Sequence, residues 1–264
     1  MTIIFKNLCE YYRKYKDLYY IFIWKEFSIR YKQTSLGVIW AVLQPLSLMG
    51  LFTVIFTYIM PVKISNVPQP VFFYAGLLPW TFFSSSMNYS ISSLTNNFDL
   101  IRKIYFPREI LPVSRIVVAF IDFMIASGIF VVLLAVHRIP LNWSTLYFFP
   151  LVGLLVLFTV SFSLIFTIMN VYYRDVQLAI NFLLQLWFFM TPVFYSTTQI
   201  PAKYKMLVSL NPLCFIIDGM RKSVVEGLLP SWKEFSFMLC YAIVLLIISY
   251  RVFKAAERKF ADVL

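Results

Sequence analysis

The chain has 264 residues, of which 61% are apolar, 19% are aromatic and only 13% are charged. Soluble domains carry roughly twice that share of charged residues, so the composition excludes a soluble enzyme, a disordered tail and a fibrous protein, and indicates an integral membrane protein. The formal net charge is +11, but the basic residues lie mostly beside apolar runs, a pattern typical of membrane orientation rather than nucleic-acid binding.

The sequence lacks the residue patterns of several kinds of chemical site. The three cysteines, Cys9, Cys214 and Cys240, have no disulfide or metal-ligand spacing, and the one histidine, His137, excludes a multi-histidine metal centre. No GxxxxGK[S/T] motif occurs, so the chain has no obvious means of hydrolysing ATP by itself. We therefore predict no catalytic residues, no metal and no cofactor in this chain.

Six apolar runs are each about long enough to cross a bilayer as a helix. In chain order they are 36–60, 71–96, 111–136, 146–171, 177–195 and 235–250. Helices are expected because isolated strands cannot satisfy their backbone in lipid, and the alternating segments of a barrel are absent. The predicted fold class is an all-α integral membrane protein with six transmembrane helices.

The distribution of Lys and Arg predicts the orientation. The segments 1–35, 97–110, 172–176 and 251–264 together hold 15 of the 23 basic residues, against seven in the alternate connections. The side with more basic residues faces the cytoplasm, so both termini are expected there. The domains follow as a cytoplasmic segment 1–35, a six-span domain 36–250 and a cytoplasmic tail 251–264.

Within the first segment, residues 18–33 are too polar to span. On a helix, Tyr20, Ile23, Trp24, Phe27 and Tyr31 form one stripe. This pattern predicts an amphipathic helix on the cytoplasmic leaflet of the membrane. An anchor that only fixes the topology is the alternative.

A basic and aromatic loop follows the second run. It reads Arg102, Lys103, Ile104, Tyr105, Phe106, Pro107, Arg108, Glu109. Lipid headgroups would explain the bases but not three consecutive apolar residues, whereas aromatics and arginines are favoured at protein docking sites. We expect a short helix over about 99–110 that docks into a cytoplasmic partner; a loop that merely returns to the membrane is the alternative.

The connection 196–234 is the longest, yet it is rich in apolar residues. Pro201, Pro212 and Pro230 divide it, and 204–210 and 215–228 read as helices too short to cross. We expect a re-entrant hairpin that forms an outer gate, with an external cap as the alternative. Asp218 and Arg221 have the i, i+3 spacing of a local ion pair.

A few charged residues lie within or beside the spans. Asp122 is the only acid well inside a run, and Arg115 lies two turns earlier on the same helix face. We expect a structural pair or cavity-lining groups there, with proton coupling as the alternative. Arg174 and Asp175 occupy the tight inner turn after the fourth run and are expected to be structural.

The aromatic content exceeds what two interfacial belts need. Aromatic faces stack on the apolar faces of sugars, so a glycan route is one hypothesis, with core or lipid-facing packing as the alternative. The candidate residues near the outer end are Tyr58, Tyr74, Trp80, Phe188, Phe189 and Tyr195.

Four ordered motifs resemble one known family. They are residues 24–40 (WKEFSIRYKQTSLGVIW) followed by Gln44-Pro45-Leu46, residues 99–112 (DLIRKIYFPREILP), residues 170–176 (NVYYRDV), and residues 191–195 (TPVFY) followed by Leu210-Asn211-Pro212. Together they resemble the membrane subunits of ABC-2 type polysaccharide exporters, the class that serves O-antigen and, in a related form, wall teichoic acid. The resemblance extends over about residues 15–255.

This resemblance implies a multi-pass protein of the cytoplasmic (inner) membrane that works as a homodimer. Two copies of a cytoplasmic ATPase subunit would bind ATP and Mg, and the complex would export a polysaccharide linked to a polyprenyl pyrophosphate lipid. It implies that 102–109 is the coupling helix, that 204–228 forms the outer gate, and that 18–31 lies at the inner interface.

The pyrophosphate of such a cargo is anionic, so basic residues at the inner mouth are candidates to attract it, first Lys25, Arg30 and Lys32. Teichoic acid, capsule, or another lipid or drug remain alternative cargoes. An integral membrane transferase and an ion-driven carrier are the alternatives from other classes. No nucleic acid is expected as a partner.

Overall fold

The computed structural model describes residues 2–32, 34, 36–61, 67–173, 175–257 and 260, and for 2–12, 205–207 and 209 it describes the backbone alone. These residues form helices and no strand. The longer helices are α1 Thr2–Tyr31, α2 Ile39–Val54, α3 Gln69–Ile91, α5 Ile110–Val136, α6 Phe148–Tyr172, α7 Val176–Met190 and α10 Trp232–Glu257. The shorter ones are α4 Phe98–Lys103, α8 Ala202–Ser209 and α9 Pro212–Arg221.

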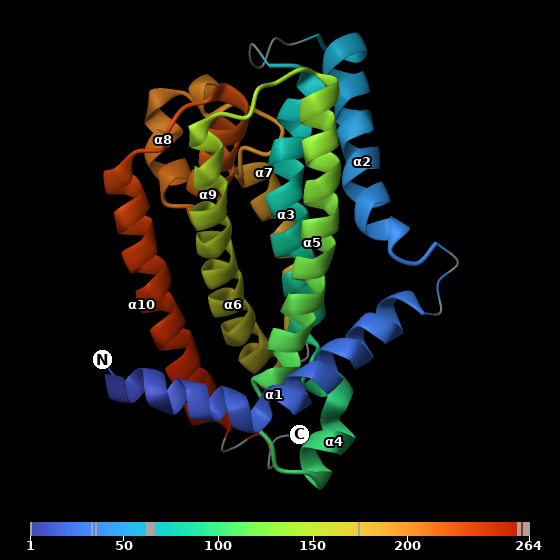
Figure 1. The fold of residues 1–264 in the computed structure, drawn as a ribbon, viewed down its shortest axis with the longest axis vertical. Coiled ribbons are helices and arrows are strands. Elements are labelled where there is room, and N and C mark those ends of the chain that lie inside the picture. The colour runs from blue at the N-terminus through green and yellow to red at the C-terminus, as the bar shows by residue number, and fades with distance from the viewer. Residues whose placement is uncertain are drawn as a thin grey trace.

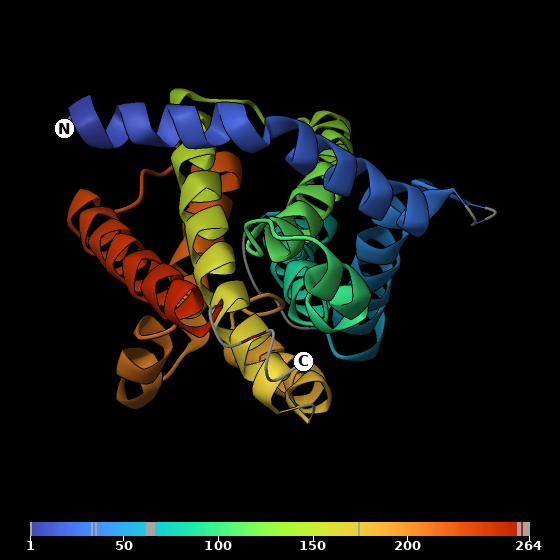
Figure 2. The ribbon, with the colours of Figure 1, turned by 90° about the horizontal axis from the view of Figure 1, so that it is seen from below.

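The long helices stand side by side as an upright bundle, and α1 runs across one end of it (Figure 1). Seen from below, α1 passes beneath both halves of the bundle (Figure 2). The end of α10 and the helix α4 lie at this end, while α8 lies at the opposite end. We refer to the α1 end as the inner end and to the α8 end as the outer end.

Four stretches of the described chain are long and apolar enough to cross a membrane: 39–59, 110–136, 143–172 and 232–257. They correspond to four of the six predicted spans. The helix α7 is apolar but has only 15 residues. The helix α3 is long enough, yet a run of serines and an asparagine makes its second half more polar. Membrane crossing by α3 and α7 therefore stays a prediction.

Burial explains the polarity of α3. This helix packs against α2, α5, α6, α7 and α9, and residues 71–80 are all buried. Polar groups near its inner half pair within the bundle, since Thr167 of α6 donates to the Ser90 carbonyl (3.1 Å) and Asn170 to that of Ile91 (3.2 Å). A helix enclosed by protein does not need a uniformly apolar surface, because it meets little lipid.

The helix α1 is longer than predicted. It begins at Thr2 and continues unbroken to Tyr31. In the predicted apolar stripe, Tyr20 and Trp24 are exposed, whereas Phe22, which lies outside that stripe, is buried. The bundle therefore takes up one side of α1 and leaves an aromatic side free; contact of that side with lipid stays a proposal.

At the outer end, α8 and α9 correspond to the two short helices predicted over 204–210 and 215–228, each beginning two or three residues earlier than expected. A single π-helical turn, Lys222–Glu226, extends α9, and Gly227 ends it with φ +71°. Side chains other than glycine rarely adopt that conformation, so a glycine is required where the chain turns toward α10.

One close approach joins this outer region to α3. A Cβ atom built on Gly76 would lie 2.5 Å from the Val193 carbonyl oxygen and 2.6 Å from Nη2 of Arg221. Glycine is needed here because any side chain would push the segment that follows α7 away from α3.

The substitution Gly76→Ala should therefore destabilise the protein by about 3 kcal/mol, because backbone atoms must move to admit the methyl group. The measurement is the midpoint of thermal unfolding in a mild detergent. The matched control is Gly128→Ala in α5, where no atom lies within 4 Å of the added Cβ and the higher helix propensity of alanine should leave stability equal or slightly higher. Equal midpoints for the two variants would contradict the close approach.

Candidate functional site

The loop between α3 and α5 forms a tip at the inner end of the molecule. The helix α4 ends at Lys103, and Ile104 has extended backbone (φ −134°, ψ 134°). The helix predicted over about 99–110 is thus shorter than expected. The reason is local: Pro107 disfavours the helical conformation at the residue before it and cannot donate a helical hydrogen bond.

The eight predicted docking residues divide into two groups. Arg102, Lys103, Ile104 and Tyr105 are exposed, Tyr105 to 94%, and we call them the tip. Phe106 to Glu109 are buried, and we call them the root. Only the tip presents side chains to a partner.

The root is fastened to two other helices. The Phe106 ring stacks on Phe22 of α1, with ring centroids 5.6 Å apart. The Arg108 backbone N–H donates to the Glu257 carboxylate (2.8 Å), and its guanidinium donates to the Glu257 carbonyl (2.7 Å). Lys254 of α10 pairs with Glu109 at 2.7 Å. A force on the tip therefore reaches α1, α5 and α10 together.

Two basic residues near the end of α1 contact the bundle, whereas Arg13, Lys14 and Lys16 are exposed. Lys25 donates to the side-chain oxygen of Asn97 (2.7 Å). Arg30 and Tyr31 both donate to the carboxylate of Asp122. Lys32, by contrast, is exposed. Two of the three bases predicted at the inner mouth are thus already engaged with side chains of the protein.

The predicted pairing of Arg115 with Asp122 is wrong. Seven residues separate them along α5, which is about 10.5 Å of helix rise. Charged side chains of α1 pair with each of them instead. Glu26 pairs with Arg115 (3.1 Å) and Arg30 with Asp122. Each of the two residues is paired with a residue of another helix, α1.

A cavity of about 510 Å³ opens between α1, α3 and α5 at the inner end. Arg30 and Arg115 both line it, with Glu26 as the acid beside them. The Arg30 guanidinium lies 3.9 Å from the ring centroid of Tyr89, and Arg115 donates to the Tyr89 carbonyl (2.6 Å). The cavity thus presents two guanidinium groups held in place, each of them paired with a carboxylate, Arg30 with Asp122 and Arg115 with Glu26.

The turn before α7 is only partly described. Arg174 lies outside the described residues. Asp175 is exposed and precedes the first residue of α7, where the partial positive charge of a helix start favours an acid. Its structural role stays a prediction.

The predicted glycan-route aromatics have different environments. Tyr58 and Phe189 are exposed, to 78% and 65%. Phe188 packs against Trp80 (5.3 Å) and Phe52 (6.2 Å), and the Tyr195 hydroxyl donates to the Phe189 carbonyl (3.3 Å). These residues form an aromatic region between α2, α3 and α7.

Tyr74 does not belong on any route. Its side chain is fully buried, and its hydroxyl donates to the Ala126 carbonyl at 2.9 Å. Trp80 is also largely enclosed, at 7% exposure. Sequence reasoning placed both by their position along α3, but it could not know that this helix is surrounded on most sides.

The predicted ion pair between Asp218 and Arg221 is also wrong. Asp218 pairs with Lys222, one helical turn away (2.8 Å), while Arg221 is 1% exposed and turns into the protein. Its guanidinium donates to the carbonyls of Pro192 (3.0 Å) and Val193 (2.9 Å). No carboxylate of the described residues lies within ion-pair distance of it.

Burial lowers the pKa of Arg221 to about 10, so the group is charged at neutral pH. The buried positive charge is stabilised by the carbonyls that follow α7 and by the Phe72 ring. The guanidinium carbon lies 3.7 Å from the centroid of that ring. Arg221 thus fastens α9 to both α3 and the end of α7. Its role was missed because nothing in the sequence tells a buried arginine from an exposed one.

The comparisons with known proteins bear on the whole of this arrangement. Residues 17–225, from the second half of α1 to the end of α9, match the family described as ABC-2 type transporter. The chain belongs to the ABC-2 type transporter family. The family expected from the four motifs is confirmed.

Individual relatives of this ABC-2 transporter chain are similar over nearly their full length. It is 30% identical over 249 residues to the O-antigen export system permease protein RfbA of Klebsiella pneumoniae (94% of this chain, 95% of the relative). It is 31% identical over 252 residues to the protein of the same name from Myxococcus xanthus (94% and 96%). The polysialic acid transport protein KpsM of Escherichia coli is 24% identical over 247 residues (88% and 91%).

The contact between α1 and α5 in this ABC-2 transporter should show energetic coupling. We expect a double-mutant cycle on Arg30→Ala and Asp122→Ala to give a coupling energy of about 1 to 3 kcal/mol, because each single change leaves a partly buried charge without its partner. The measurement is unfolding in a mild detergent. Lys32→Ala is the control, and additive effects of the two changes would contradict the pairing.

Proposed function

We propose that the chain is the transmembrane subunit of an ATP-driven exporter that moves a polysaccharide linked to a polyprenyl pyrophosphate lipid across the cytoplasmic membrane, with O-antigen as the cargo class. The observation that carries this proposal is the roughly 30% identity, over 94% of the chain, to O-antigen export permeases. The chain contains no P-loop motif, so ATP and Mg would be bound by a separate subunit.

The proposed membrane arrangement has six spans: the four long apolar helices plus α3 and α7. Both termini would lie in the cytoplasm, since α1 and α4 carry much of the basic charge and share one end. Leu51 of α2 and Leu178 and Phe182 of α7 are exposed on the isolated chain. A second copy would cover part of this apolar surface, and two copies would frame a route wide enough for a glycan.

The tip Arg102–Tyr105 is the proposed docking element for the ATPase. Its exposed aromatic and basic side chains suit a protein interface. Because the root is fastened to α1 and α10 and leads directly into α5, a movement of the docked ATPase would shift these helices as one body. Transmission to α9 would follow through α3 and Arg221.

The cavity that holds Arg30 and Arg115 is the proposed site for the lipid pyrophosphate. Guanidinium groups bind phosphate oxygens with two parallel hydrogen bonds, and both are already oriented by Tyr89. Lys25 and Lys32 do not line this cavity, so we place Arg30 first among the three bases predicted at the inner mouth, and add Arg115.

Other cargoes and classes make different demands. The polysialic acid relative KpsM favours a capsular glycan as the second candidate cargo. Only chemical identification of the bound cargo would distinguish teichoic acid, another lipid or a drug from it. A membrane transferase would need a polar catalytic cluster, and the inner acid Glu109 is instead held by Lys254. An ion-driven carrier would need Asp122 free to titrate, but this residue binds Arg30 and Tyr31.

The first test is purification of the full chain from its native membranes in a mild detergent. We expect a P-loop ATPase to co-purify at equal stoichiometry and a lipid-linked glycan to be detected in the complex. Tyr105→Ala should abolish co-purification of the ATPase without changing thermal unfolding, because this side chain is almost wholly exposed. A chain that purifies alone in every detergent would overturn the proposal.

The neighbouring root residue is the matched control for the tip. Phe106→Ala removes a buried ring and should lower the unfolding free energy by about 3 kcal/mol. If Tyr105→Ala and Phe106→Ala destabilised the protein equally, the division into tip and root would be incorrect.

The anion site has its own prediction. Arg30→Lys keeps the charge opposite Asp122 but loses the forked donors and the stacking on Tyr89, so export should fall about tenfold while unfolding changes little. The readout is the lipid-linked glycan that accumulates inside cells. Arg251→Lys, an exposed arginine of α10 outside the cavity, is the control; normal export by Arg30→Lys would remove this residue from the site.

A further inference from the structure

A second cavity lies at the outer end, away from the inner anion site. It has a volume of about 810 Å³, which is within the range of small-molecule sites. The segment after α7, the short helices α8 and α9, and the start of α10 supply its lining. None of the residues that line it takes part in the tip, the root or the inner cavity.

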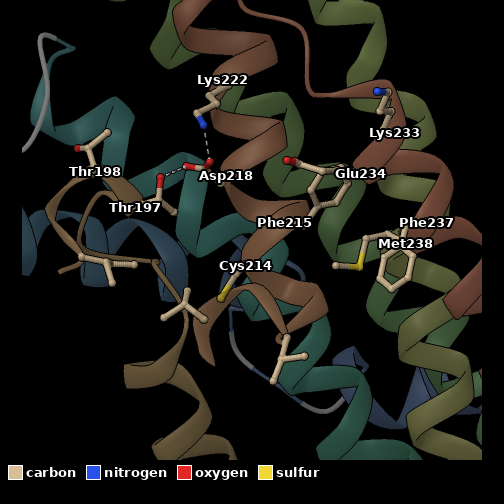
Figure 3. A pocket seen from close by; sticks show the side chains of 13 residues that line it. Thr197, Thr198, Cys214, Phe215, Asp218, Lys222, Lys233, Glu234, Phe237 and Met238 are labelled. Atoms are coloured by element: carbon tan, nitrogen blue, oxygen red, sulfur yellow. Dashed lines mark hydrogen bonds and ion pairs between the residues drawn. The ribbon is translucent and has the colours of Figure 1, made fainter. Parts of the chain in front are cut away.

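The lining of this cavity has two layers (Figure 3). Lys222 and Asp218 of α9 and Lys233 and Glu234 of α10 lie in the upper part of the view, with Phe237 and Met238 below them. On α10 the lining changes from charged to apolar within about one helical turn, since Phe237 follows Lys233 by four residues. A layer of charges above an apolar floor is the arrangement that a lipid headgroup and its chains require.

The charged layer has two bases and two acids. Asp218 pairs with Lys222 (2.8 Å) and accepts a hydrogen bond from Thr197 (3.1 Å). Burial lowers the pKa of Lys222, but the hydrogen bond with Asp218 and the charges of Asp218, Glu226 and Glu234 together raise it above its usual value. Lys233 and Glu234 are exposed, and neither forms an ion pair with another described residue. A net-neutral ligand that itself carries one positive and one negative group complements this set.

Two exposed tryptophans lie on segments next to this cavity. Trp232, immediately before the two free charges, is exposed to 67%, and Trp143 is also exposed. Trp143 begins a short helical turn whose Ser144 bonds to the Ser223 carbonyl beside α9 (2.8 Å). Tryptophan is enriched where headgroups meet hydrocarbon, so these positions set the cavity at headgroup depth.

We infer that this outer cavity binds a zwitterionic phospholipid with a primary ammonium group, such as phosphatidylethanolamine. The phosphate lies between Lys222 and Lys233, the ammonium lies at Glu234, and the acyl chains leave along Phe237 and Met238. The inference goes beyond export and is independent of the cargo, because the ligand is a membrane lipid held beside the outer gate.

The test uses the full chain in vesicles of equal phosphatidylethanolamine and phosphatidylglycerol. After extraction in a mild detergent, native mass spectrometry counts the lipids retained per chain. The wild type should retain one phosphatidylethanolamine with about fivefold preference over phosphatidylglycerol, as expected for one partly exposed charge contact. Retention in the bulk ratio would overturn the inference.

Two charge variants must then act in different ways. Lys233→Glu removes a phosphate contact and should lower retention of both lipids, whereas Glu234→Gln removes the ammonium contact and should shift the preference toward phosphatidylglycerol. A loosened fold would lower retention of both lipids in each variant, so the shift identifies binding.

The controls make similar charge changes away from the cavity. Lys203→Glu in α8 and Asp175→Asn before α7 alter exposed residues that do not line the cavity and should leave the wild-type preference unchanged. If the controls behaved like the cavity variants, the retained lipid would be bound elsewhere and the inference would fail. Because lipid retention requires neither ATP nor glycan, failure here would leave the proposed export function untouched.

Discussion

A polar group buried away from water needs partners inside the protein, and this constraint organises the outer half of the fold. Arg221 is the extreme case, because a guanidinium cannot lose its charge at neutral pH. The carbonyls after α7 and the Phe72 ring surround it, and Gly76 leaves the space. The end of helix α7 and the position of α9 against α3 both follow from that one buried charge.

The same constraint acts differently at the inner end. There the charged side of α1 meets the polar positions of α3 and α5, so that Lys25, Glu26 and Arg30 are each satisfied by the bundle. These contacts hold α1 against the helices that it crosses in Figure 2. The helix α1 is therefore bound to the bundle by several charge contacts.

The inner loop has an exposed half and an enclosed half. Its tip offers Tyr105 and its neighbours to a partner, and its root is enclosed by α1 and α10. Aromatic packing and the pair between Lys254 and the buried Glu109 thus lie immediately behind the exposed surface. One loop therefore joins a fully exposed segment to an enclosed one.

The sequence by itself determined the helical class, five of the helix positions to within a few residues, the short outer helices and the family. Hydrophobic run length, proline placement and four local motifs are properties of contiguous residues, and they need no knowledge of packing. The polar run in α3 could not be explained from the sequence, because its cause is enclosure by other helices.

Only the tertiary structure decided which charges meet. Arg115 and Asp122 share a helix face, yet each is paired by α1; Asp218 and Arg221 have ion-pair spacing, yet one side chain points out and the other in. Tyr74 and Tyr58 read alike in sequence and lie at opposite extremes of burial. Such pairings depend on where distant helices cross, and a contact of that kind leaves no signature in the spacing along either helix.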